Sequence, residues 1–129
     1  MALVSLAGCS PASGPVEVAA LLAQCDSYLG KTVEVVGYIG ECGGYSCILF
    51  ADQAAAAKPF ANRGAAIGVG GNEAFDAKAG PLQNSDVVIT GTMDKKNCTG
   101  EGGTDRSAGL IPTDIRAWTS PGGAPGNTQ

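Results

Sequence analysis

Two valine-rich segments, each interrupted by one glycine, constrain the fold of this chain more than any other feature. They are TVEVVGYI at residues 32–39 and DVVITGTM at residues 86–93. β-Branched residues in alternation predict strands, and a glycine inside a strand indicates a bulge or a sharp bend. Two strands that both bend strongly are what a small closed β-barrel requires. The sequence therefore predicts a mainly-β domain, and its 20 glycines also argue against a helical bundle.

Two short helices and further strands are predicted around these segments. Apolar residues at helical spacing predict a helix over residues 16–25. Asn72 as a cap and Gly80 as a stop delimit a second helix over residues 72–80. Pro112 confines the start of the last strand to an edge or a bulge. Three more strands are predicted at residues 46–52, 64–70 and 109–118.

The composition narrows the classes of function. The chain has 129 residues and no histidine, which removes the commonest general base and the commonest metal ligand. We therefore predict a non-catalytic protein with no metal and no cofactor. The formal net charge of −4 repels phosphate backbones. On that ground the sequence predicts no nucleic-acid partner.

The N-terminal segment contains a candidate membrane anchor. Leu6-Ala7-Gly8-Cys9 resembles the lipobox of bacterial lipoproteins, in which the signal peptide is removed before a cysteine that then carries acyl chains. The resemblance implies that Cys9 is the lipidated residue, at the bacterial cell envelope. We interpret residues 1–15 as the last part of a signal peptide, the lipobox and a flexible tether. The alternative is an ordinary disordered N-terminus that contains a cysteine.

The order of the predicted elements resembles an OB-fold with an added N-terminal helix, of the kind found in exported bacterial lipoproteins. The resemblance rests on LLAQCDSYLGKTVEVVGYI, DVVITGTM and CTGEGGTDRSAGLIPTDI. It implies a small five-stranded barrel over residues 16–118, with a short helix between the third and fourth strands. Residues 119–129 form a Gly/Pro-rich tail that we expect to be disordered.

The chain has five cysteines, so removing Cys9 leaves four. Cys42 and Cys47 flank a predicted hairpin turn, across which facing residues are close enough for a disulfide. The OB-fold resemblance implies that Cys98, after the fourth strand, lies near Cys25, before the first. We therefore expect the pairs Cys42–Cys47 and Cys25–Cys98. A four-cysteine zinc site is the alternative, although two of the four cysteines are isolated in the sequence.

Candidate ligand-binding residues lie in two predicted loops. Asp105 and Arg106 precede the last strand, where an arginine could bind a carboxylate or a phosphate. Tyr45 lies at the tip of the predicted hairpin. The alternative for the Asp105–Arg106 pair is a local ion pair that orders a glycine-rich loop. Tyr38 and Phe50 are assigned to packing rather than to ligand binding.

Two functions remain open from the sequence. The first is a non-catalytic envelope lipoprotein, attached to a membrane through its lipid, that binds a partner or serves a structural role. The second is an envelope protein that binds a small ligand or an oligosaccharide near Tyr45 and Asp105.

Overall fold

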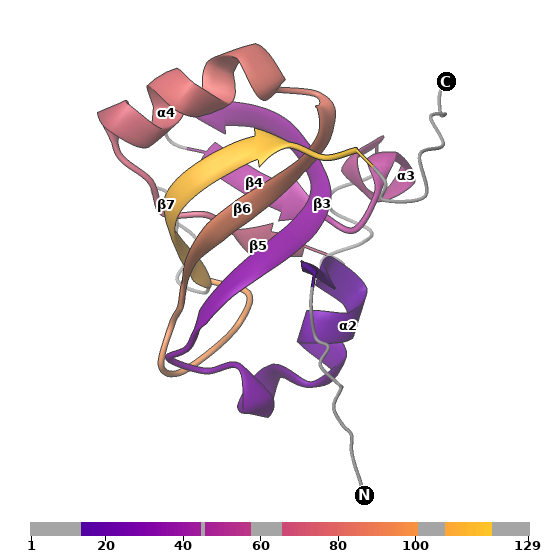
Figure 1. The fold of residues 1–129 in the computed structure, drawn as a ribbon, viewed down its shortest axis with the longest axis vertical. Helices are drawn as coiled ribbons and strands as arrows, with labels where there is room; N and C mark the ends of the chain where they lie inside the picture. Colours follow the sequence, from indigo (N-terminus) through magenta and orange to yellow (C-terminus); the bar gives the residue numbers. More distant parts are fainter. Residues whose placement is uncertain (1–13, 45, 58–65, 101–107, 120–129) are drawn as a thin grey trace, which may run out of the picture.

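The computed structural model describes residues 14–44, 46–57, 66–100 and 108–119. They form a strongly curved sheet with helices at its ends (Figure 1). The elements are β2 Val16–Glu17, α2 Val18–Ala23, η2 Cys25–Ser27, β3 Thr32–Gly43, β4 Ser46–Phe50, α3 Gln53–Ala57, β5 Ala66–Gly68, α4 Glu73–Ala79, η4 Gly80–Leu82, β6 Ser85–Met93 and β7 Leu110–Ala117.

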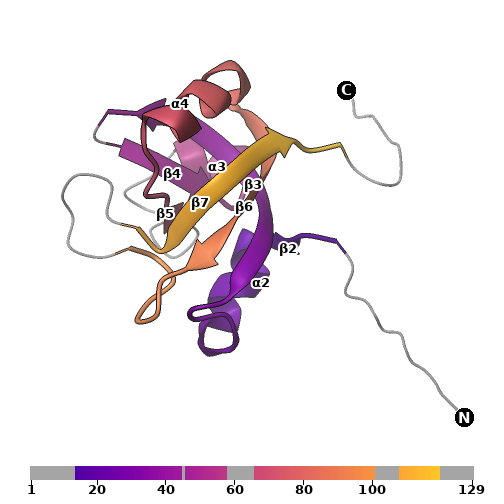
Figure 2. The ribbon, with the colours of Figure 1, turned by 60° about the vertical axis from the view of Figure 1, so that its left-hand side comes forward.

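The five main strands close into a barrel in the order β5-β4-β3-β6-β7. The long strand β3 pairs antiparallel with both β4 and β6, so it bends between two parts of the sheet (Figure 2). A parallel bridge between Val69 and Leu110 joins the two ends of the sheet. The Gly70 N–H donates to the Leu110 carbonyl oxygen at 3.0 Å beside that bridge. This is the OB-fold arrangement, and α4 lies between the third and fourth barrel strands as the sequence predicts.

The bend predicted at Gly91 is a β-bulge. Thr90 faces Asp114 and Gly91 faces Pro112, so Thr113 is the extra residue on β7. A Cβ at Gly91 would overlap the carbonyl oxygen of Ile111. Pro112 therefore lies at a bulge, as predicted.

The interior of the barrel is apolar. Alternate residues of each strand point inward, and α2 and α4 close the two ends. Among the residues that the structure describes, no polar or charged side chain is buried. The largest fully buried side chains are Leu21, Ile39, Leu49, Ile67, Ile89, Met93 and Leu110.

The N-terminal element differs from the prediction of a helix over residues 16–25. Val16 and Glu17 form a short parallel strand that pairs with Val35 and Val36 of β3. The remaining residues form α2 and the 3₁₀-helix η2. The edge of β3 opposite β6 is open at this height, so the backbone of residues 16 and 17 finds partners there that a helix would not use.

The second predicted helix is confirmed as α4. The Asn72 side chain accepts a hydrogen bond from the Phe75 N–H at 3.0 Å, which caps the helix. Phe75 and Ala79 are buried against the barrel. The sequence did not predict α3, an alanine-rich turn in which Asp52 Oδ1 accepts the Ala55 N–H at 2.8 Å.

Both predicted disulfides are present. Cys42 and Cys47 face each other across β3 and β4 with their Cα atoms 4.1 Å apart. Cys25 of η2 joins Cys98, after β6, with a Cα separation of 5.9 Å. The four sulfurs are therefore bonded in pairs rather than gathered as zinc ligands.

Candidate functional site

The candidate residues that the sequence placed in loops fall outside the described part of the chain. This applies to Tyr45, to Asp105 and Arg106, and to the proposed lipidation site Cys9. No set of three or more His, Cys, Asp or Glu side chains within the described residues could hold a metal ion. The described helices include none that is long and apolar enough to cross a membrane.

The outward-facing side of β2, β3, β6 and β7 carries a group of side chains that the strand pairing arranges in rows. We call it the outer sheet face. Residues that face each other in the ladder point to the same side of the sheet, so the pairing defines three rows. These rows are Tyr38–Asp86–Trp118, Glu17–Val36–Val88–Arg116 and Glu34–Thr90–Asp114. Trp118 extends the first row because its N–H donates to the Asp86 carbonyl oxygen at 3.0 Å.

The centre of this face is apolar and covered. Val88 points away from the core, yet its exposed fraction is only 1%. It lies between Val36 and Arg116 in its own row, with Tyr38 and Trp118 at the diagonal positions. Both aromatic residues are half-buried. The face therefore combines a closed apolar centre with the partly exposed side chains of two aromatic residues.

An ion pair crosses the face above strand β6. Arg116 Nη2 on β7 lies 3.8 Å from Glu34 Oε2 on β3, although the two strands are separated by β6. Each of the two side chains is about half exposed, so the pair adds little stability. Its geometric effect is to hold two long side chains over the middle of the sheet, near Val88.

The rim of the face is acidic. It carries four carboxylates, from Glu17, Glu34, Asp86 and Asp114, against Arg116 on the same rows. Lys78 of α4 reaches Asp114 from the side, with Nζ 3.3 Å from Oδ1. The hydrogen bond from Lys78, followed by one from the Ile115 N–H, lowers the pKa of Asp114. Within the described residues, Glu17 and Asp86 form no ion pair.

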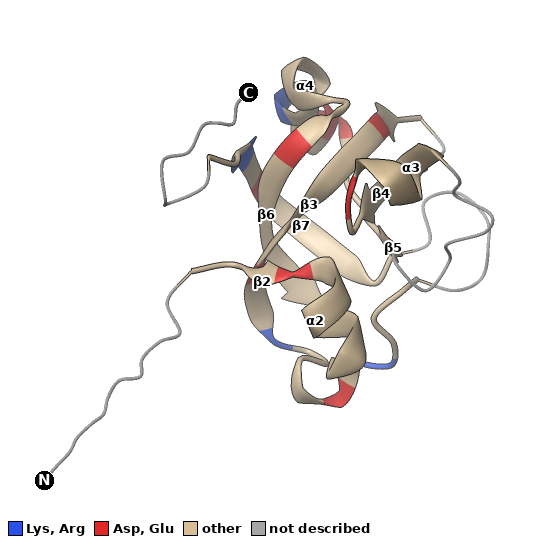
Figure 3. Ribbon diagram, turned by 90° about the vertical axis from the view of Figure 1, so that its right-hand side faces the viewer, with Lys and Arg blue, Asp and Glu red and all other residues tan. Residues whose placement is uncertain are grey.

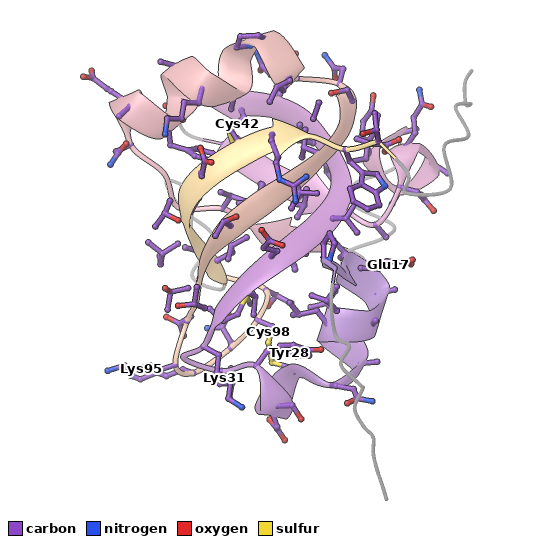
Figure 4. The ribbon with its side chains drawn as sticks, in the orientation of Figure 1. Glu17, Tyr28, Lys31, Cys42, Lys95 and Cys98 are labelled. Carbon is purple, nitrogen blue, oxygen red and sulfur yellow. A yellow bond between two sulfur atoms is a disulfide. The ribbon has the colours of Figure 1, made fainter. Side chains whose placement is uncertain are left out.

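A second charged region lies at the end of the barrel beside η2, and we call it the lysine end. It consists of Lys31, which precedes β3, and of Lys95 and Lys96, which follow β6. Figure 4 shows Lys31 and Lys95 close together at this end. The Met93 N–H donates to the Lys31 carbonyl oxygen at 2.9 Å, which brings the two segments together. None of the three lysines forms an ion pair with a residue that the structure describes.

The lysine end also contains two carboxylates. Asp94 Oδ2 accepts the Lys96 N–H at 2.7 Å and the Asn97 N–H at 3.1 Å, so it serves to order the loop. Asp26 lies on η2. Figure 3 shows acidic and basic positions together at the end of the molecule below α2. Three of the five described basic side chains are thus gathered at one end, whereas Lys78 and Arg116 are paired with carboxylates elsewhere.

Sequence reasoning did not assemble either region. It assigned Tyr38 to packing rather than to a binding surface. The alternation of each strand was the available signal, because it separates outward from inward residues. The rows themselves depend on which strands are neighbours and in what register, and alternation within one strand does not contain that information.

No protein-family model matches the sequence, and no curated protein does. Among solved structures, the chain is similar to U. maydis replication protein A, in a structure bound to single-stranded DNA. The two share 16% sequence identity and align with a TM-score of 0.46. The match covers 84% of this chain and 77% of the other.

The sequence predicted that the chain has no nucleic-acid partner, and this prediction is corrected. The similar structure is that of a protein bound to single-stranded DNA. The exclusion rested on the net charge of the whole chain, and the lysine end shows that this average does not describe the local charge. A local basic region, rather than the sum over the chain, is what meets a phosphate backbone.

Proposed function

We propose that this chain is a non-catalytic, lipid-anchored module of the bacterial cell envelope that binds a protein partner through its outer sheet face. The observation that carries the proposal is the arrangement of Tyr38 and Trp118 around the covered centre at Val88. Protein interfaces typically combine partly exposed aromatic side chains with a closed apolar centre and a polar rim.

Two features support the envelope as the location. The residues Leu6 to Cys9 resemble a lipobox, with Cys9 as the acylated residue. Two disulfides are typical of small domains in oxidising compartments. The absence of histidine and the apolar interior of the described barrel support a binding role over a catalytic one.

The anchor is tested by expression from a bacterial signal sequence joined ahead of Leu6. We expect the wild type to take up labelled palmitate and to fractionate with membranes. Cys9→Ser removes the thiol that receives the diacylglyceryl group and should abolish the label. Soluble, unlabelled wild-type protein would contradict the anchor.

The binding face is tested by photo-crosslinking in envelope extracts. A photoreactive residue at Thr90, on the middle strand of the outer sheet face, should give a discrete crosslinked product. The same residue at Ala77, exposed on α4, is the matched control and should not. Trp118→Ala should reduce the Thr90 product. Equal crosslinking at both positions, insensitive to Trp118, would contradict the proposal.

The lysine end favours a second candidate function, the binding of single-stranded nucleic acid. Lys31, Lys95 and Lys96 are exposed and without ion pairs in the described structure. Such a site should bind a labelled oligothymidylate with an affinity that falls with salt, by a slope of about 0.7 per phosphate neutralised. Replacing Lys95 and Lys96 with Gln should abolish this binding. No binding at low salt would eliminate this candidate.

A further inference from the structure

The charges on the outer sheet face indicate what kind of partner it receives. From the row Tyr38–Asp86–Trp118 we infer that the face binds a cationic polypeptide segment, with one arginine or lysine side chain seated at Asp86. This inference rests on the proposed function and names the chemical class of its partner.

Asp86 lies between the two aromatic residues of its row. It lies on the middle strand of its row, directly opposite Tyr38 on β3, and its carbonyl oxygen accepts the Trp118 N–H at 3.0 Å. Neighbouring strands are about 4.8 Å apart, so the backbone of each aromatic residue lies one strand spacing from the backbone of Asp86. Asp86 itself is exposed, and within the described residues no basic side chain pairs with it.

A carboxylate between two aromatic residues suits a positively charged side chain. A carboxylate attracts a cation, and a guanidinium also stacks on aromatic rings. An aromatic residue on either side of a carboxylate therefore presents both kinds of contact to one arginine. A phosphate or a carboxylate in the same position would face Asp86 and be repelled.

The rest of the outer sheet face is also rich in carboxylates. Glu17 lies at the end of the neighbouring row and also has no ion pair within the described part of the chain. Glu34 pairs with Arg116, and Asp114 pairs with Lys78. The side chains of both pairs are about half exposed. Exposed pairs of this kind exchange partners at little cost. A segment with several basic residues therefore finds one defined binding position at Asp86, surrounded by the other carboxylates of the face.

The experiment uses Trp118 as its probe, because it is the only tryptophan in the chain. The oxidised protein is titrated with hexa-arginine, and Trp118 fluorescence is recorded at 50 mM and 300 mM salt. We expect a saturable change at low salt and weaker binding at high salt. Hexa-glutamate and a neutral chitin oligosaccharide are titrated in parallel and should give no saturable change.

Three variants test whether the cationic side chain binds at Asp86. Asp86→Asn should weaken hexa-arginine binding about tenfold, and Tyr38→Ala about threefold, because a ring is lost while the carboxylate remains. Glu41→Gln is the matched control: Glu41 is also an exposed carboxylate on β3, but it lies beyond the outer sheet face, and its affinity should not change. Thermal unfolding of each variant verifies that the barrel is intact.

The outcomes separate this inference from the proposed function. Equal weakening by Asp86→Asn and Glu41→Gln would mean general charge attraction and would overturn the seat at Asp86. Binding of the neutral oligosaccharide in place of hexa-arginine would overturn the cationic class. If the Thr90 crosslink forms but hexa-arginine does not bind, the protein partner stands and the present inference fails. If hexa-arginine binds at Asp86 but no Thr90 crosslink forms, the proposed function fails instead.

Discussion

Gly37 on β3 lies directly against the backbone of Phe50 on β4. A Cβ at Gly37 would be 2.5 Å from the Phe50 carbonyl oxygen, 2.9 Å from Val18 Cγ2 and 3.0 Å from Leu49 Cγ. The sequence predicted a bulge or a bend at this glycine. The register shift in β3 falls instead between Ile39 and Cys42, and Gly37 serves to let α2 and β4 approach β3.

This contact predicts that Gly37→Ala destabilises the barrel strongly. The new methyl group meets a backbone oxygen that cannot move without shifting the sheet, so we expect a loss of about 2–3 kcal/mol in the free energy of unfolding. Gly40→Ala on the same strand is the control, because its Cβ would lie 3.6 Å from the Phe50 ring, an ordinary contact. Urea unfolding of both variants measures the difference, and equal stabilities would contradict the packing described at Gly37.

The two disulfides should contribute unequally to stability. In the chain-entropy model, the Cys25–Cys98 bridge, with a separation of 73 residues, contributes about 4 kcal/mol. The Cys42–Cys47 bridge, with a separation of 5, contributes about 2 kcal/mol. Paired Cys→Ser replacements at each bridge, compared by urea unfolding, should therefore rank in that order. The reverse order would show that the short bridge has a role beyond closing its loop.

The Lys78–Asp114 pair predicts a pH effect on stability at the rim of the outer sheet face. Because the pKa of Asp114 is lowered in the folded state, its contribution to stability is present above the unfolded pKa of about 3.9 and is lost as the pH falls through the folded pKa. An NMR titration should therefore place the midpoint of Asp114 below its usual value. Lys78→Met should raise that midpoint, whereas Lys31→Met should leave it unchanged. An unaltered midpoint in Lys78→Met would show that the pair is not maintained in solution.

The cap of α4 gives a local test of helix formation. Asn72→Ala removes the acceptor for the Phe75 N–H and should cost about 1 kcal/mol. Asn72→Asp keeps an acceptor at the same position and should remain close to the wild type in its unfolding midpoint. If Ala and Asp are equally destabilising, the loss comes from another property of the asparagine.

Much of the secondary structure could be read from the sequence because its causes are local. Strand β6 coincides with the segment SDVVITGTM at residues 85–93, and α4 begins after Asn72, as its cap residue indicates. The helix ends at Ala79, but Gly80 keeps helical dihedral angles and begins η4 instead of stopping the chain in a left-handed conformation. The pairing of Cys42 with Cys47 followed from a short hairpin turn, whose ends must lie together. The pairing of Cys25 with Cys98 needed the whole barrel topology, which came from the OB-fold resemblance.

The tertiary structure alone decided the features that depend on neighbours distant in sequence. Val16 and Glu17 form a strand rather than a helix because β3 offers them an open edge. Of the aromatic residues beside Asp86, Tyr38 lies on β3 and Trp118 directly follows β7, and only the register of β3, β6 and β7 aligns them. Periodicity shows which side of its own strand a residue occupies. The long-range hydrogen bonds that close the barrel determine which residues it meets there.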